Sequence, residues 1–76
     1  MRELVRTNDV VLVTVIEALL NGAGIKHVVL DQNMSVLEGS LGILPRRILV
    51  SVADARVARR ILADAGLAHE LRPDGG

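Results

Sequence analysis

The chain has 76 residues, enough for one domain, and its nine basic and nine acidic residues give a formal net charge of +0. Such a balance provides no overall field to attract nucleic acid or an anionic membrane, and the absence of Phe, Tyr and Trp removes the rings on which bases stack. The absence of cysteine excludes disulfides, thiolate zinc sites and cysteine nucleophiles. We also find no signal-peptide pattern and no apolar stretch of ~18 residues, so we expect a cytoplasmic protein that binds neither membrane nor nucleic acid.

The first half of the chain reads as a strand followed by a helix. Residues 3–7 alternate weakly, and Asn8-Asp9 suits a helix N-cap. The run from Val10 to Asn21 is rich in β-branched residues, but its length and the glycines that follow it favour a helix. The only polar residues within this run fall on one narrow stripe of the helix surface. This predicts a helix whose surface is mostly covered by the rest of the protein.

The second half repeats this pattern. A short apolar run at 25–30 predicts strand 2, and because Pro45 cannot donate to a sheet ladder, strand 3 is expected at 47–52. Ala53-Asp54 is predicted to open a second helix, with Asp54 as its N-cap. Gly66 ends that helix, and the chain would finish with an edge strand at 67–71 and a frayed tail at 72–76. The residues expected to face inward on the second helix are Val57, Ile61, Leu62 and Ala65.

The two halves align as an internal repeat. Residues 20–27 match residues 62–69, and the strand–cap pair at 7–9 matches 52–54. Two βαβ units in tandem predict an α+β fold of the ferredoxin-like βαββαβ type: a four-stranded antiparallel-type sheet in the order 4-1-3-2, with both helices on one face. We expect residues 1–71 to form this single domain.

The repeat also predicts which strand residues face the helices. Val5, Val50 and Val52 should face inward, while Leu4 and Leu49 should lie on the open face of the sheet. In strand 2 both parities carry aliphatic side chains. An apolar patch on an open face usually means that something covers it, either the connection between the halves or a second copy of the protein. Because so small a domain needs extra burial, we expect a homo-oligomer, with a dimer favoured.

The connection at 31–47 belongs to neither half. It mixes turn-forming residues with aliphatic side chains that a solvated linker would not need. We therefore expect an ordered loop packed against the sheet. In this loop Asp31, Asn33 and Ser35 would shape the backbone, and Met34 would anchor the loop or a partner.

Arg46 and Arg47 end this connection, and with Arg6 on the neighbouring strand they could form a small cationic site. Arginine forks suit carboxylate and phosphate groups. The plainer alternative, which we favour, is that these arginines pair with Asp31, Glu38 or Glu3 and remain solvated.

Metal binding and catalysis find little support. His27 and His69 would lie on opposite edges of the sheet, ~14 Å apart, too far to share one zinc ion. No nucleophile elbow or metal-binding histidine pair at helical spacing is present. We therefore predict no metal site, no cofactor and no enzymatic activity. The alternative is a small enzyme or metal-dependent catalyst that uses Asp31, Glu38 and His27.

Several stretches of the chain resemble a known family. These are residues 4–9, 17–20 and 23–25, and above all 31–40 together with 44–50. They are similar to small bacterial proteins catalogued as putative prokaryotic signal-transducing proteins of unknown function, whose fold is similar to that of the PII-like nitrogen regulators. The resemblance covers nearly the whole chain and implies a ferredoxin-like domain, with small-molecule sensing or partner binding by analogy.

The sequence thus predicts a regulatory or adaptor module. It would bind a protein partner or a small anionic ligand through the loop at 31–47 and the open sheet face. The residues predicted to take part in this binding are Asp31, Asn33, Met34, Ser35, Glu38, Arg46 and Arg47.

Overall fold

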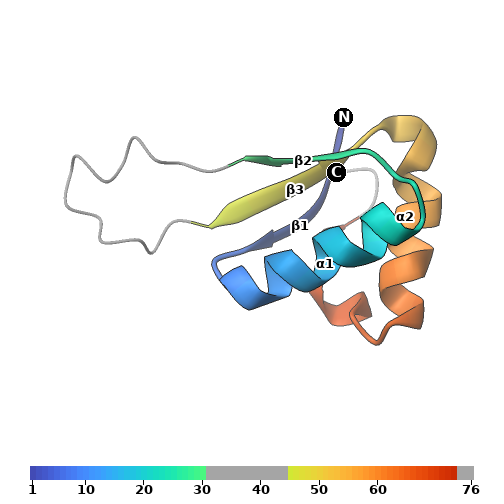
Figure 1. Ribbon diagram of the computed structural model, residues 1–76. Helices are drawn as coiled ribbons and strands as arrows, with labels where there is room; N and C mark the ends of the chain where they lie inside the picture. Colours follow the sequence, from blue (N-terminus) through green and yellow to red (C-terminus); the bar gives the residue numbers. More distant parts are fainter. Residues whose placement is uncertain (31–44, 74–76) are drawn as a thin grey trace.

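The computed structural model describes residues 1–30 and 45–73, and within them two helices lie on one side of a three-stranded sheet (Figure 1). The fold is therefore α+β, as predicted. The order of elements is β-α-β-β-α followed by a short 3-10 helix. The elements are β1 (Arg2–Thr7), α1 (Val10–Gly22), β2 (His27–Leu30), β3 (Arg46–Val50), α2 (Val52–Asp64) and η2 (Ala68–Glu70).

The sheet has the order β1-β3-β2, and both pairings are antiparallel. This order agrees with the predicted positions of the first three strands. The predicted fourth strand at 67–71 is wrong for the described residues, because the chain forms η2 there. A single antiparallel bridge between Val5 and Leu71, and a hydrogen bond from the Arg72 amide to the Leu4 carbonyl at 2.9 Å, bring the chain to the outer edge of β1. The last segment thus occupies the expected side of β1 without becoming a strand.

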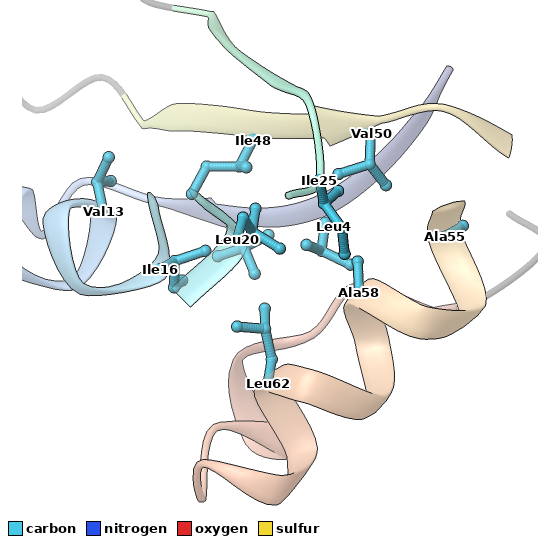
Figure 2. Packing of buried hydrophobic residues seen from close by; sticks show 11 residues of the cluster. Leu4, Val13, Ile16, Leu20, Ile25, Ile48, Val50, Ala55, Ala58 and Leu62 are labelled. Atoms are coloured by element: carbon cyan, nitrogen blue, oxygen red, sulfur yellow. The ribbon is translucent and has the colours of Figure 1, made fainter. Parts of the chain in front are cut away.

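A β-bulge in β1 overturns part of the predicted strand parity. Glu3 pairs with Leu49 and Val5 with Ile48, so Leu4 is the extra residue between two consecutive partners. A bulge sets two neighbouring residues against one and turns the strand. Consequently Leu4 and Val5 are both buried, and Leu4 is only 1% exposed instead of lying on the open face. Figure 2 shows Leu4 among the core side chains between the sheet and α2.

Both helices begin at a capping side chain. The Asp9 carboxylate accepts the amides of Val11 and Leu12 at 3.0 and 3.1 Å, which confirms the predicted cap of α1. The cap of α2 is Ser51, whose hydroxyl accepts the Asp54 amide at 3.2 Å. The prediction of Asp54 as the cap is therefore wrong: Asp54 lies in the first turn, where its carboxylate accepts the Ser51 hydroxyl and favours the positive end of the helix dipole.

The early start of α2 also corrects the predicted strand 3. The strand ends at Val50, so Ser51 is a cap and Val52 is the first helical residue, 62% exposed, instead of an inward-facing strand residue. A serine followed three residues later by an acidic side chain is a helix-start signature, and it prevails over the β-branched character of Val50 and Val52.

The helix ends show the internal repeat most clearly. After α1 the amides of Gly24 and Ile25 bond to the carbonyls of Asn21 and Leu20, and after α2 Gly66 and Leu67 repeat the arrangement. Both glycines have a positive φ, 72° and 83°, as a Schellman motif requires. The glycine stops are therefore confirmed at both helices.

The repeat extends through the core. Each helix has 13 residues, and equivalent positions 42 residues apart are buried in both. The buried pairs are Val13 and Ala55, Ile16 and Ala58, and Leu20 and Leu62. These side chains pack against Val5, Ile48 and Val50 of the sheet (Figure 2). Because Asp9 precedes its helix as Ser51 does, its counterpart is Ser51 and not Asp54.

Some predicted helix faces are wrong. On α2, Val57 and Ala65 are exposed, and the buried face is made by Ala55, Ala58 and Leu62, whose spacing of three and four residues sets them on one side of the helix. On α1, the expectation of a mostly covered helix fails as well, since Val11 and Val15 are 72% and 44% exposed. The outer side of α1 therefore exposes apolar side chains.

Two predictions remain untested by the described residues. The packing of the loop against the sheet concerns residues 31–44, which lie outside the described parts of the chain. The predicted boundary between a domain at 1–71 and a tail at 72–76 also stays a prediction. Arg72, the first residue beyond that boundary, accepts a hydrogen bond from Arg59 Nη1 on its carbonyl at 2.6 Å.

Candidate anion-binding site on the open sheet face

The face of the sheet opposite the helices carries aliphatic and charged side chains together. Val29 and Ile48 pair across β2 and β3 and point toward the helices, so their neighbours on each strand point away. This parity places Val28 beside Leu49 and Leu30 beside Arg47 on the open face. The pairing of β2 with β3 therefore shows that Val28 and Leu30 face outward.

Glu3 is the centre of a cluster of three arginines. Arg6 donates two hydrogen bonds to its carboxylate, from Nε to Oε1 and from Nη2 to Oε2, both at 3.1 Å. Arg47 on the adjacent strand donates from Nε to Oε2 at 2.9 Å, and Arg72 brings its Nε to 3.3 Å from Oε1. We call Glu3, Arg6, Arg47 and Arg72 the arginine cluster. Three positive groups around one negative group leave a local excess of positive charge on a chain that is neutral as a whole.

The position of Glu3 sets its pKa. Its side chain is only 17% exposed, and burial alone would raise the pKa of the carboxyl. The hydrogen bonds from Arg6 and Arg47, together with their positive charges, outweigh burial and hold the pKa of Glu3 below its ordinary value. Glu3 is therefore ionised at neutral pH.

The sequence predicted part of this cluster. Pairing of Arg6 and Arg47 with Glu3 was one of the alternatives, and it is confirmed for both arginines. Arg46 is half-buried at the start of β3, opposite Thr7, and so lies on the other face from Arg47. The remaining predicted binding residues lie outside the described residues, and these are Asp31, Asn33, Met34, Ser35 and Glu38.

Arg72 was missed because it had been assigned to the tail. No local pattern in the sequence indicates that Arg72 reaches Glu3, since that contact depends on the path of the chain after α2. The central role of Glu3 was also missed. A charged residue two positions before a buried valine on a strand would ordinarily point to the same side as that valine, and only the bulge turns it to the open face.

The histidines do not come together. His27 on β2 places Nε2 2.9 Å from Glu17 Oε1 of α1, and Nδ1 lies 3.4 Å from the Ile25 carbonyl. His69 lies in η2, with Nε2 3.3 Å from Glu70. Among residues 1–30 and 45–73, no group of three His, Cys, Asp or Glu side chains is placed to hold a metal ion. In the alternative catalytic set, only His27 is described, and its ring nitrogen is already engaged by Glu17.

In the described parts of the chain, neither helix has the length and apolar character needed to cross a bilayer.

Comparison with known proteins identifies the family. A search of curated proteins finds no match. The family described as "Putative prokaryotic signal transducing protein" matches residues 1–66, which run from the start of β1 to the glycine after α2 and include Glu3, Arg6 and Arg47 of the arginine cluster. Since the match spans well over half of the sequence, this chain belongs to the family of putative prokaryotic signal transducing proteins.

Proposed function

We propose that the protein is a cytoplasmic, non-enzymatic regulatory or adaptor module whose open sheet face binds an anionic group, a carboxylate or a phosphate, on a small ligand or a protein partner. The observation that carries the proposal is the arginine cluster, in which one carboxylate faces three guanidinium groups. The signal-transducing description of the family and the fold analogy with PII-like regulators support a binding role.

The donors of the arginines support binding of a second anion. A guanidinium has five N–H donors in a planar fork. Arg6 binds Glu3 through two of its donors, Nε and Nη2, whereas Arg47 and Arg72 each contact Glu3 through Nε. The terminal amino groups of Arg47 and Arg72 can therefore serve an incoming carboxylate or phosphate while Glu3 holds the guanidinium groups in position.

The neighbouring side chains add an apolar part to the site. Leu30 pairs with Arg47, and Val28 pairs with Leu49 on the same face. Val28 and Leu30 are both exposed, so a ligand bound at Arg47 could bury aliphatic surface at the same time. An acidic side chain on an apolar peptide segment fits this combination better than a free inorganic anion.

The assembly that we propose is a homo-oligomer, with a dimer as the simplest form. The exposed valines of α1 support it, because a second copy would remove them from water. This part of the proposal does not depend on the anion site, and each can fail without the other.

Calorimetric titration tests the anion site. The purified protein is titrated with inorganic phosphate and, separately, with a short peptide of alternating glutamate and valine. We expect the peptide to bind, and Arg47→Gln to weaken that binding at least tenfold, about 1.4 kcal/mol. The matched control is Arg60→Gln, which removes the same charge from the exposed side of α2.

The outcomes separate specific binding from general attraction. If Arg47→Gln and Arg60→Gln weaken binding equally, the peptide responds to net charge and the site is refuted. If neither phosphate nor peptide binds the unmodified protein, the proposal fails for both sources of the anion. Tighter binding of phosphate than of peptide would favour a small-molecule ligand over a protein partner.

A further inference from the structure

A line of apolar and small residues runs along the exposed side of α1, flanked by the exposed Thr14 and Asn21. Val11, Val15, Ala18 and Gly22 follow one another at intervals of four, three and four residues, and all four are exposed. This spacing places them in a single line along a helix, as in the seam of a coiled coil. We call these four residues the outer stripe. No charged residue belongs to it.

The internal repeat provides a comparison for this stripe. The equivalent residues of α2, 42 positions later, are Ala53, Val57, Arg60 and Asp64. The two helices have the same length, capping residues at equivalent positions and the same buried positions, yet the equivalent line on α2 carries two charges near its end. The scaffold itself therefore does not require an uncharged outer face, and the apolar character of α1 has another cause.

Gly22 also indicates a contact from outside the chain. Gly22 is the last residue of α1 and leaves the end of the outer stripe without a side chain. A Cβ added at Gly22 would meet nothing within 4 Å, so packing inside the described chain does not explain the glycine. The equivalent residue in α2 is Asp64, which shows that this helical position accepts a side chain. A close approach of another backbone from outside would account for it.

We propose that the outer stripe is the interface of a homodimer in which α1 packs antiparallel against α1 of a second copy. The valines occupy the first half of the stripe and the small residues occupy the second half. An antiparallel, two-fold arrangement sets Val11 and Val15 of each copy against Gly22 and Ala18 of the other, so that large side chains meet small ones. A parallel arrangement would set large against large and leave a gap between the small residues.

Charge complementarity supports the same orientation. Asp9 stands immediately before α1 and Lys26 stands four residues after it. Antiparallel packing brings the Asp9 end of each copy toward the Lys26 end of the other, at both ends of the interface, and it also opposes the two helix dipoles. The match of Asp9 with Lys26 at both ends favours a second copy of this chain as the occupant. The proposal refines the proposed homo-oligomer and is independent of the arginine cluster.

Sedimentation equilibrium of the full chain tests the dimer. We expect a mass twice the 8.1 kDa of one chain, and we expect Val15→Glu to shift the protein to the monomer, with the dissociation constant raised at least tenfold. The matched control is Val57→Glu, which places the same charge at the repeat-equivalent, also exposed position of α2 and should leave the mass unchanged. Far-UV circular dichroism of both variants verifies that each is folded.

Disulfide trapping tests the orientation without relying on a destabilising charge. The chain has no cysteine of its own, so Val15→Cys and Ala18→Cys can be prepared separately and mixed under oxidising conditions. Antiparallel packing predicts that the mixed disulfide exceeds both self-linked products several-fold. The control pair, Val57→Cys and Arg60→Cys, should cross-link only at the rate of random collision.

Several results would overturn this interface. A protein that stays monomeric at all concentrations would overturn it, because the outer stripe would then not join two copies, whatever else covers it. A dimer that tolerates Val15→Glu, or in which Val15→Cys links to itself more readily than to Ala18→Cys, would also contradict it. A Val15→Glu monomer that still binds the acidic peptide would show that the anion site stands by itself, and a dimer that fails to bind the peptide would refute only the anion site.

Discussion

Glu3 and Arg6 form a two-pronged ion pair on β1, with both N–O distances at 3.1 Å, although residues three apart on a regular strand face opposite sides of a sheet. The bulge at Leu4 makes the pair possible, because it adds one residue between Glu3 and Val5 and so turns Glu3 to the open face. The bulge that places Leu4 in the core therefore also assembles the arginine cluster on the other face of the sheet.

Removal of the Glu3 charge should destabilise the fold. In Glu3→Gln the three arginines lose their shared carboxylate and repel one another, and we expect a loss of about 1 to 2 kcal/mol after solvent screening of the half-exposed arginines. Urea denaturation measures the free energy of unfolding. Asp64→Asn, an exposed change on α2, is the control and should shift stability by no more than about 0.5 kcal/mol. Equal effects of the two changes would mean that the cluster contributes nothing to stability.

The pKa of Glu3 predicts the direction of a pH effect. Burial raises this pKa, but the hydrogen bonds and charges of Arg6 and Arg47 lower it below the ordinary value of 4.5. Because the unfolded chain binds the proton more tightly, the stabilisation from Glu3 is fully present above about pH 4.5 and is lost as the pH falls through the folded pKa. Urea midpoints measured from pH 7 to pH 3 should therefore fall less steeply in Glu3→Gln than in the unmodified protein. Parallel curves would contradict the lowered pKa.

Leu4 distinguishes the bulged strand from a regular one. In the bulged strand its side chain is buried, so Leu4→Ala should cost about 2 to 5 kcal/mol. On a regular strand the same side chain would lie on the open face and its loss would cost much less. Val52→Ala, at an exposed helical position, is the control, and thermal and urea unfolding of both variants provides the measurement. A Leu4→Ala protein as stable as the control would exclude the bulge.

The cap of α2 can be tested in the same way. Ser51→Ala removes the side chain that accepts the Asp54 amide, and we expect a loss of about 1 kcal/mol. Asp54→Ala should cost less, about 0.3 to 1 kcal/mol, because Asp54 contributes mainly through the helix dipole. The ratio of the two losses is the informative quantity, and a larger loss for Asp54→Ala would restore Asp54 as the cap.

Much of the architecture was predictable because its signals are local. Asp9 before α1, and the glycines that end both helices, act on backbone groups only a few residues away, so the start and end of α1 could be read directly from the sequence. The repeat around Gly24 and Gly66 likewise gave the order of the first three strands. Where two local signals competed, as at Ser51 and Asp54, the chain still contained the answer, since the serine with an acid three residues later marks a helix start.

The sequence by itself determined the α+β class, the start of α1, the glycine stops of both helices, the order of the first three strands and the family to which the chain belongs. The tertiary structure alone decided that Leu4 is buried, that Glu3 gathers Arg6, Arg47 and Arg72, and that the chain after α2 forms η2 instead of a fourth strand. The reason is physical. Caps and glycine stops satisfy neighbouring backbone groups, whereas a one-residue bulge and the course of a terminal segment depend on the register and packing of strands far apart along the chain.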